Sequence, residues 1–187
     1  MKQQNGAIAS NGRPCRAAKE LCQVAAVCFR KNSSGVEFLL VQTDGGRWTF
    51  PKGNIKPWMG ARKSALLEAM EEAGADGNID ERPFHTYVAA KGVFWKAEGV
   101  QEYSVQSYLM EVKQTSMPAE GFREPTWFPA ATAREQLAEG RERKYAQELA
   151  RAVDEALKAI NRIKNLPSRN GHRTSSHSTS SLPLFMM

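Results

Sequence analysis

The sequence predicts an α/β protein in which a mixed β-sheet carries helices on both faces. Three observations support this fold class. Short apolar runs rich in β-branched and aromatic residues recur along the chain, as expected for strands. Between these runs, over residues 61–73, apolar residues are spaced by three and four positions, which predicts an amphipathic helix. Two further helical patterns, over 130–139 and 143–165, follow the last run.

Six segments are predicted as β-strands, because each is a short apolar or aromatic run bounded by turn residues. In chain order they are 23–30, 36–43, 47–50, 83–95, 103–112 and 125–129. The polar loop KNSSG joins the first two as a hairpin. Gly74 follows the first helix at the position where a left-handed glycine often ends a helix. The predicted element order is therefore β-β-β-α-β-β-β-α-α.

Composition indicates one soluble domain with a tail at each end. The chain has 187 residues, of which 41% are apolar and 25% charged, and this length can bury a sizeable core. Residues 1–20 are polar and basic and are predicted to form a flexible N-terminal arm. Residues 166–187 are rich in Ser and are predicted to be disordered. The folded domain is expected over residues 21–165.

The net charge of +6 is concentrated in the two tails. Residues 1–20 hold four basic residues and one acid, and residues 166–187 hold two basic residues and no acid. The domain between them is close to neutral. The charge pattern therefore gives little support to a nucleic-acid partner.

The three cysteines argue against a disulfide framework and against a zinc site, because their number is odd and no CxxC occurs. No apolar run reaches the roughly 18–20 residues that span a bilayer. The N-terminal residues lack the apolar run of a signal peptide. We therefore expect a cytoplasmic protein without a membrane partner, and leave its oligomeric state open.

The helix predicted over 61–73 carries Glu68, Glu71 and Glu72. These positions are related as i, i+3 and i+4, so the three carboxylates share one helix face. They repel one another, and the helix dipole disfavours them near a C-terminus. A cation among them would relieve both costs, and clustered carboxylates select Mg²⁺ or Mn²⁺. A solvated acidic face is the alternative that the string EAMEE by itself leaves open.

Residues 53–75, which include this helix, resemble the Nudix box, whose pattern is Gly-x5-Glu-x7-Arg-Glu-U-x-Glu-Glu-x-Gly-U, with U an apolar residue. Gly53, Gly74 and the three glutamates stand at the matching positions. The resemblance covers roughly residues 21–160 and implies the α/β/α sandwich of that family, acting with Mg²⁺ or Mn²⁺ on a phosphate anhydride.

The resemblance also implies roles for single residues. Glu68 and Glu72 would be the metal ligands, with Glu68 part of the catalytic cluster. Glu71 would be the general base that takes a proton from the attacking water. The segment before the helix, RWTFPKG, would bind the substrate phosphates through Arg47, Lys52 and Gly53.

Within the family, the chain is similar to the diphosphoinositol polyphosphate and diadenosine polyphosphate phosphohydrolases. The similar segments are VCFR (27–30), FLLVQT (38–43), RW (47–48) and WFPAATAREQL (127–137). This similarity implies a small-molecule substrate, either a dinucleoside polyphosphate or an inositol pyrophosphate. The inositol-phosphate relatives carry a basic cluster before the first strand, where this chain has only Lys19, so nucleotide sugars also stay open.

Two positions depart from the box. Met59 replaces its first glutamate and cannot bind a hard cation, and Leu67 replaces its arginine and has no donor to orient a carboxylate. Two interpretations therefore remain. The chain is a Mg²⁺-dependent pyrophosphohydrolase with full or reduced activity, or it is a catalytically impaired Nudix domain that binds a nucleotide, a polyphosphate or a protein.

Overall fold

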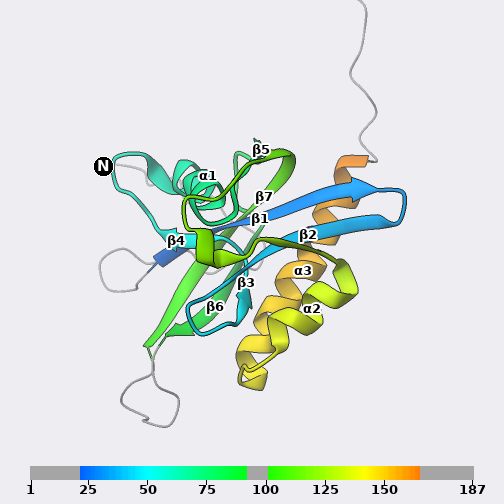
Figure 1. Ribbon diagram of the computed structural model, residues 1–187. Helices are drawn as coiled ribbons and strands as arrows, with labels where there is room; N and C mark the ends of the chain where they lie inside the picture. Colours follow the sequence, from blue (N-terminus) through cyan, green and yellow to red (C-terminus); the bar gives the residue numbers. More distant parts are fainter. Residues whose placement is uncertain (1–21, 92–100, 165–187) are drawn as a thin grey trace, which may run out of the picture.

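The computed structural model describes residues 22–91 and 101–164. The predicted arm, the predicted tail and residues 92–95 of one predicted strand lie outside these ranges. The described residues form an eight-stranded mixed sheet, with α1 (Gly60–Ala73) on one face and both α2 (Ala130–Ala138) and α3 (Arg143–Lys164) on the other (Figure 1). The predicted α/β fold class is confirmed.

The sheet is built around a parallel pair of long strands, β1 and β7, and every other pairing is antiparallel. The strands are β1 (Cys22–Asn32), β2 (Gly35–Gln42), β3 (Trp48–Thr49), β4 (Lys52–Asn54), β5 (Ala75–Ile79), β6 (His85–Lys91), β7 (Gln101–Thr115) and β8 (Thr126–Pro129). The main order is β3-β2-β1-β7-β5, with β4 on β1, β6 on β7 and β8 on β2.

Two strands and one short helix were not predicted. Strands β4 and β5 have the sequences KGN and ADGNI, and both lack the apolar run by which a strand is found. The 3₁₀-helix η2 (Gly121–Arg123) lies in the polar loop between β7 and β8. The three α-helices match their predicted ranges to within one residue at each end. No described helix is long and apolar enough to cross a membrane.

Strand β1 is buried on both faces, which explains why its sequence is an apolar run rather than an alternation. Val24 and Ala26 pack in the cluster under α1, whereas Ala25 and Val27 pack in the cluster under α2 and α3. Cys28 on this strand is a buried free thiol, but Cys22 is disulfide-bonded. The odd cysteine count, which argued against a disulfide framework, did not predict the bond at Cys22.

Gly74 ends α1 and allows the chain to turn directly into β5. Its φ is 59°, and a Cβ placed on it would lie 2.0 Å from the backbone oxygen of Ser116. Gly74→Ala should therefore lower the free energy of unfolding by more than about 2 kcal/mol, since left-handed strain and a backbone clash add. Gly46→Ala is the matched control, because Gly46 has φ 73° with no atom within 4 Å of its Cβ position. Urea unfolding of both variants measures the difference, and equal losses would contradict the role of the clash.

Candidate active site

Strand β4 fixes the loop before α1 against the centre of the sheet. It pairs antiparallel with β1, with Gly53 opposite Val24 and Lys52 opposite Ala25. This pairing brings Gly53 against the side chain of Glu68, so that a Cβ on residue 53 would lie 2.2 Å from a Glu68 carboxylate oxygen. The first glycine of the box is therefore required by the close approach of a carboxylate to the backbone.

Glu68 and Glu72, one helical turn apart on α1, point into the protein. Their exposed fractions are 8% and 4%, whereas Glu71 is partly exposed. The backbone N–H of Lys52 donates a hydrogen bond of 2.9 Å to one carboxylate oxygen of Glu72. The other oxygen accepts from the guanidinium of Arg123 at 2.8 Å. A solvated acidic face is therefore wrong for Glu68 and Glu72, and the box glutamates divide into an inner pair and an outer Glu71.

Burial makes the inner glutamates reluctant to ionise. Burial and, to a smaller extent, the neighbouring Glu72 carboxylate raise the pKa of Glu68 to about 7, against the opposing charge of Lys56. Burial also raises the pKa of Glu72, against the hydrogen bond from Lys52 and the charge of Arg123. Two carboxylates held together out of water favour either a shared proton or a bound cation.

The inner pair fits the divalent cation that the resemblance to the Nudix box implies. Mg²⁺ usually keeps several waters and takes one or two carboxylates from the protein, and Glu68 and Glu72 supply two hard oxygen donors. Among the described residues, no three Asp, Glu, His or Cys side chains are gathered to hold a metal ion. Glu68 and Glu72 are thus the two inner carboxylates that could hold a cation here, and Met59 at the N-cap of α1 adds no oxygen ligand.

The metal-free fold should become more stable on acidification from about pH 8 to about pH 5.5. The pKa of Glu68 rises from 4.5 to about 7 on folding. Between these values the folded chain binds more protons than the unfolded chain, so lowering the pH favours folding, by about 2 kcal/mol for this group. Urea unfolding at the two pH values measures the change, and Glu68→Gln should remove this part of it. An unchanged pH dependence in that variant would contradict the assignment.

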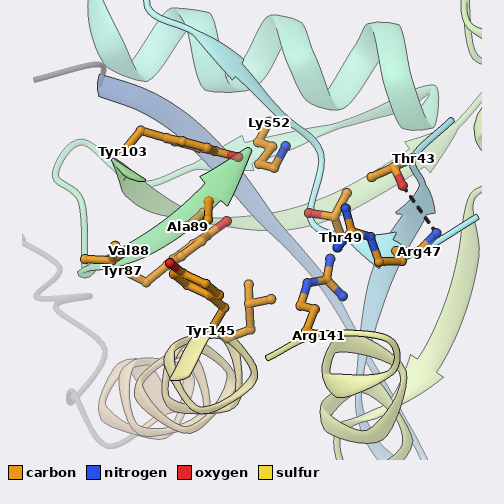
Figure 2. Close-up of a pocket in the computed structure, with 12 residues that line it drawn as sticks. Thr43, Arg47, Thr49, Lys52, Tyr87, Val88, Ala89, Tyr103, Arg141 and Tyr145 are labelled. Carbon is orange, nitrogen blue, oxygen red and sulfur yellow. Dashed lines mark hydrogen bonds between the residues drawn. The ribbon is translucent and has the colours of Figure 1, made fainter. Parts of the chain in front are cut away.

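A pocket lies between the sheet and α3, and Lys52, whose backbone N–H binds Glu72, is one of its lining residues (Figure 2). It encloses about 520 Å³ of space, open mouth included. Among the described residues that line it, none is acidic. The residues with cationic or hydroxyl groups around it are Thr43, Arg47, Thr49, Lys52, Tyr87, Tyr103, Arg141 and Tyr145. Figure 2 shows the tyrosines on one side and Arg47 and Arg141 on the other, with Lys52 between the pocket and α1.

One polar group of the pocket is buried without a partner, and two of its cations are partly buried. Within the described part of the chain, the hydroxyl of Tyr87 has no hydrogen-bond partner, although its side chain is almost completely buried. Burial lowers the pKa of Lys52. Burial and the nearby Arg47 lower the pKa of Arg141 to about 10. Arg141 is held by the carbonyl oxygens of Leu137 at 2.8 Å and Trp48 at 2.6 Å. This concentration of positive charge and donors suits an anionic ligand.

The structure brings the predicted substrate residues together only in part. Arg47 and Lys52 line the pocket, whereas Gly53 packs against Glu68 and does not. Two tryptophans near the box are not among the residues that line the pocket: Trp48 packs edge-on against Phe128 at 5.0 Å, and Trp58 is 79% exposed.

Sequence reasoning missed two features of the site. The tyrosines of the pocket lie on β6, β7 and α3, and nothing in their spacing links them. Arg123 lies on η2, 51 positions after the glutamate that it contacts. Its neighbourhood, GFREP, carries no motif that predicts such a contact.

Comparison with known proteins agrees with this geometry. The family model described as the NUDIX domain matches residues 22–149, and the chain therefore belongs to the Nudix family. No curated protein matches the sequence.

Solved structures show the same fold at low sequence identity. A Caenorhabditis elegans (C. elegans) Ap4A hydrolase in a binary complex is 19% identical with a TM-score of 0.52, over 75% of this chain and 98% of that one. The NUDIX domain of Shewanella oneidensis NrtR, complexed with ADP ribose, is 18% identical with a TM-score of 0.53, over 80% and 94%. The Bacillus subtilis pyrophosphohydrolase BsRppH is 17% identical with a TM-score of 0.53, over 79% and 87%.

Proposed function

We propose that this Nudix chain hydrolyses a pyrophosphate linkage in a small dinucleoside polyphosphate or inositol pyrophosphate, with Mg²⁺ or Mn²⁺ as cofactor. The observation that carries the proposal is that Lys52 contacts both the glutamates and the pocket. Its backbone N–H holds Glu72 of the inner pair, and its side chain lines the cationic pocket. A phosphate chain bound in the pocket would therefore extend to the carboxylates of α1.

Each group of the site has a defined task in this reaction. Glu68 and Glu72 would hold the divalent cation, which neutralises developing charge and lowers the pKa of a bound water. Glu71, partly exposed on the same helix, would accept the proton of the attacking water. Arg47, Lys52 and Arg141 would bind the phosphates and stabilise negative charge on the leaving group.

The solved relatives support a substrate of this chemical kind. Their names describe an Ap4A hydrolase, a domain complexed with ADP ribose, and a pyrophosphohydrolase. All three names concern molecules or reactions with phosphate anhydrides. They support the class of the substrate and leave its identity to experiment.

A binding module without turnover is the second candidate. Met59 and Leu67 remove a carboxylate and an arginine that the box supplies elsewhere, and the described residues offer two inner carboxylates rather than three. Such a chain would still hold a polyphosphate in the pocket, because the pocket's cations do not depend on these two positions.

Hydrolysis of a panel of phosphate anhydrides separates the two candidates. The panel contains diadenosine polyphosphates, ADP-ribose, nucleoside triphosphates and an inositol pyrophosphate, each with Mg²⁺ and with Mn²⁺. We expect turnover of at least one member by the native chain and its loss in Glu71→Gln. Tight binding without turnover by the native chain would favour the binding module.

Tyr87→Phe should weaken ligand binding without weakening the fold. The hydroxyl of Tyr87 is buried and has no partner among residues 22–91 and 101–164, and removing such a group is neutral or stabilising, by up to about 1 kcal/mol. If the hydroxyl meets a phosphate, its loss should raise KM several-fold. Tyr108→Phe is the matched control, because Tyr108 is buried under α1, away from the pocket. A Tyr87→Phe variant with unchanged KM would contradict the placement of the substrate.

A further inference from the structure

Arg123 reaches the glutamate cluster from outside the box. Its side chain is 18% exposed and that of Glu72 is 6% exposed, so their 2.8 Å ion pair is largely out of water. The same guanidinium donates to Glu120 at 2.6 Å and to the backbone oxygen of Gln42 at 3.3 Å. One planar group thus connects α1, the loop that carries η2, and the end of β2.

The loop that presents Arg123 is itself attached to α1. The backbone N–H of Glu120 donates to the backbone oxygen of Glu71 at 3.1 Å, and the guanidinium of Arg123 lies 4.8 Å from the ring centroid of Phe122. These contacts restrict the side chain at both ends. Arginine suits the place because its donors form a rigid fork, whereas a lysine ammonium is a point charge.

We propose that Arg123 is a positioning residue that supplies, from η2, the carboxylate-orienting cation which Leu67 cannot supply from within the box. This inference rests on the proposed function. The oriented carboxylate is not the same in the two cases. An arginine at position 67 would lie one helical turn from Glu71, whereas Arg123 contacts Glu72. Arg123 and the Lys52 backbone N–H together occupy one direction on each Glu72 oxygen and leave the remaining lone pairs for a cation.

A double-variant cycle with Mn²⁺ as the probe tests this inference without relying on turnover. Mn²⁺ binding is followed by electron paramagnetic resonance in the native chain, Arg123→Met, Glu72→Gln and the double variant. Loss of a group that orients a ligand typically costs about 10- to 100-fold in metal affinity or activity, so Arg123→Met should weaken Mn²⁺ binding about 10-fold. In the Glu72→Gln background the same change should have no further effect, because Arg123 acts through Glu72.

Two controls separate positioning from general stability. Arg62→Met removes another arginine paired with a glutamate, at 3.3 Å from Glu81, which is not one of the inner glutamates, and should leave Mn²⁺ binding unchanged. Arg123→Lys should recover part of the lost affinity. Urea unfolding confirms that each variant is folded under the conditions of the titration.

The outcomes are distinct. Equal losses from Arg123→Met in both backgrounds would overturn the inference, because Arg123 would then act independently of Glu72. Tighter Mn²⁺ binding by Arg123→Met would also overturn it, because Arg123 would then compete with the metal. Mn²⁺ binding is measured directly, so the inference can hold even in a chain without turnover. If the enzyme is active and Arg123→Met leaves its Mn²⁺ binding unchanged, the inference is refuted while the proposed function stands.

Discussion

Glu68→Gln is expected to lower turnover about 10³-fold while leaving the metal-free fold as stable as before, or more stable. The loss follows because a neutral amide binds a divalent cation weakly and cannot balance its charge. The fold is spared because Gln has nearly the same shape and Glu68 resists ionisation in its buried site, where its pKa is about 7. The rate constant kcat with saturating Mg²⁺ and the free energy of unfolding without metal measure the two effects.

Glu81→Gln is the matched control for this experiment. Glu81 is 82% exposed and pairs with Arg62, outside the inner pair, so its replacement should change neither quantity appreciably. A Glu68→Gln variant that unfolds more readily than the native chain would show that the carboxylate is structural. Native turnover in Glu68→Gln would remove Glu68 from the metal site.

Gly53→Ala should have the second largest effect, about 10²-fold on turnover, although it adds one methyl group. The new Cβ would lie 2.2 to 2.4 Å from the three carboxylate atoms of Glu68, so the carboxylate must move by more than an ångström. A displacement of this size at a catalytic group costs about 10²-fold in rate. The contact is with the flexible end of a side chain, so the fold should lose at most about 1 kcal/mol.

Gly45→Ala provides the comparison for Gly53→Ala. Gly45 lies in the turn before β3, and its Cβ position has no contact closer than 3.9 Å. Its replacement should leave turnover within about twofold of the native value. Equal effects of the two substitutions would show that residue 53 matters through backbone freedom rather than through Glu68.

The elements that were predicted correctly are those whose sequence pattern lies within the element itself. The helix of the glutamates was found from its period and from Gly74, and β1 from a run of apolar residues. Strand β4 was missed because KGN becomes a strand only by pairing with β1. Tertiary pairing, rather than propensity, makes those three residues extended.

The candidate site also contains residues that the sequence predicts and residues that it does not. The three glutamates and Gly53 follow from spacing, because the helix period sets their relation. The inward direction of Glu68 and Glu72 could not be predicted, because it depends on where β4 lies. Arg123 and Tyr87 come from distant segments that meet only in the folded chain, so their contacts have no counterpart in the sequence pattern.

A Mn²⁺ titration of the native chain and of Glu72→Gln, followed by electron paramagnetic resonance, tests the central claim most directly. The claim is that the buried pair Glu68 and Glu72 holds the divalent cation on which hydrolysis depends. We predict a Mn²⁺ site in the native chain, together with stabilisation by Mg²⁺. In Glu72→Gln we predict no Mg²⁺ stabilisation and a residual Mn²⁺ affinity that is at least about 10-fold weaker. Equal Mn²⁺ binding by the two proteins would contradict the account.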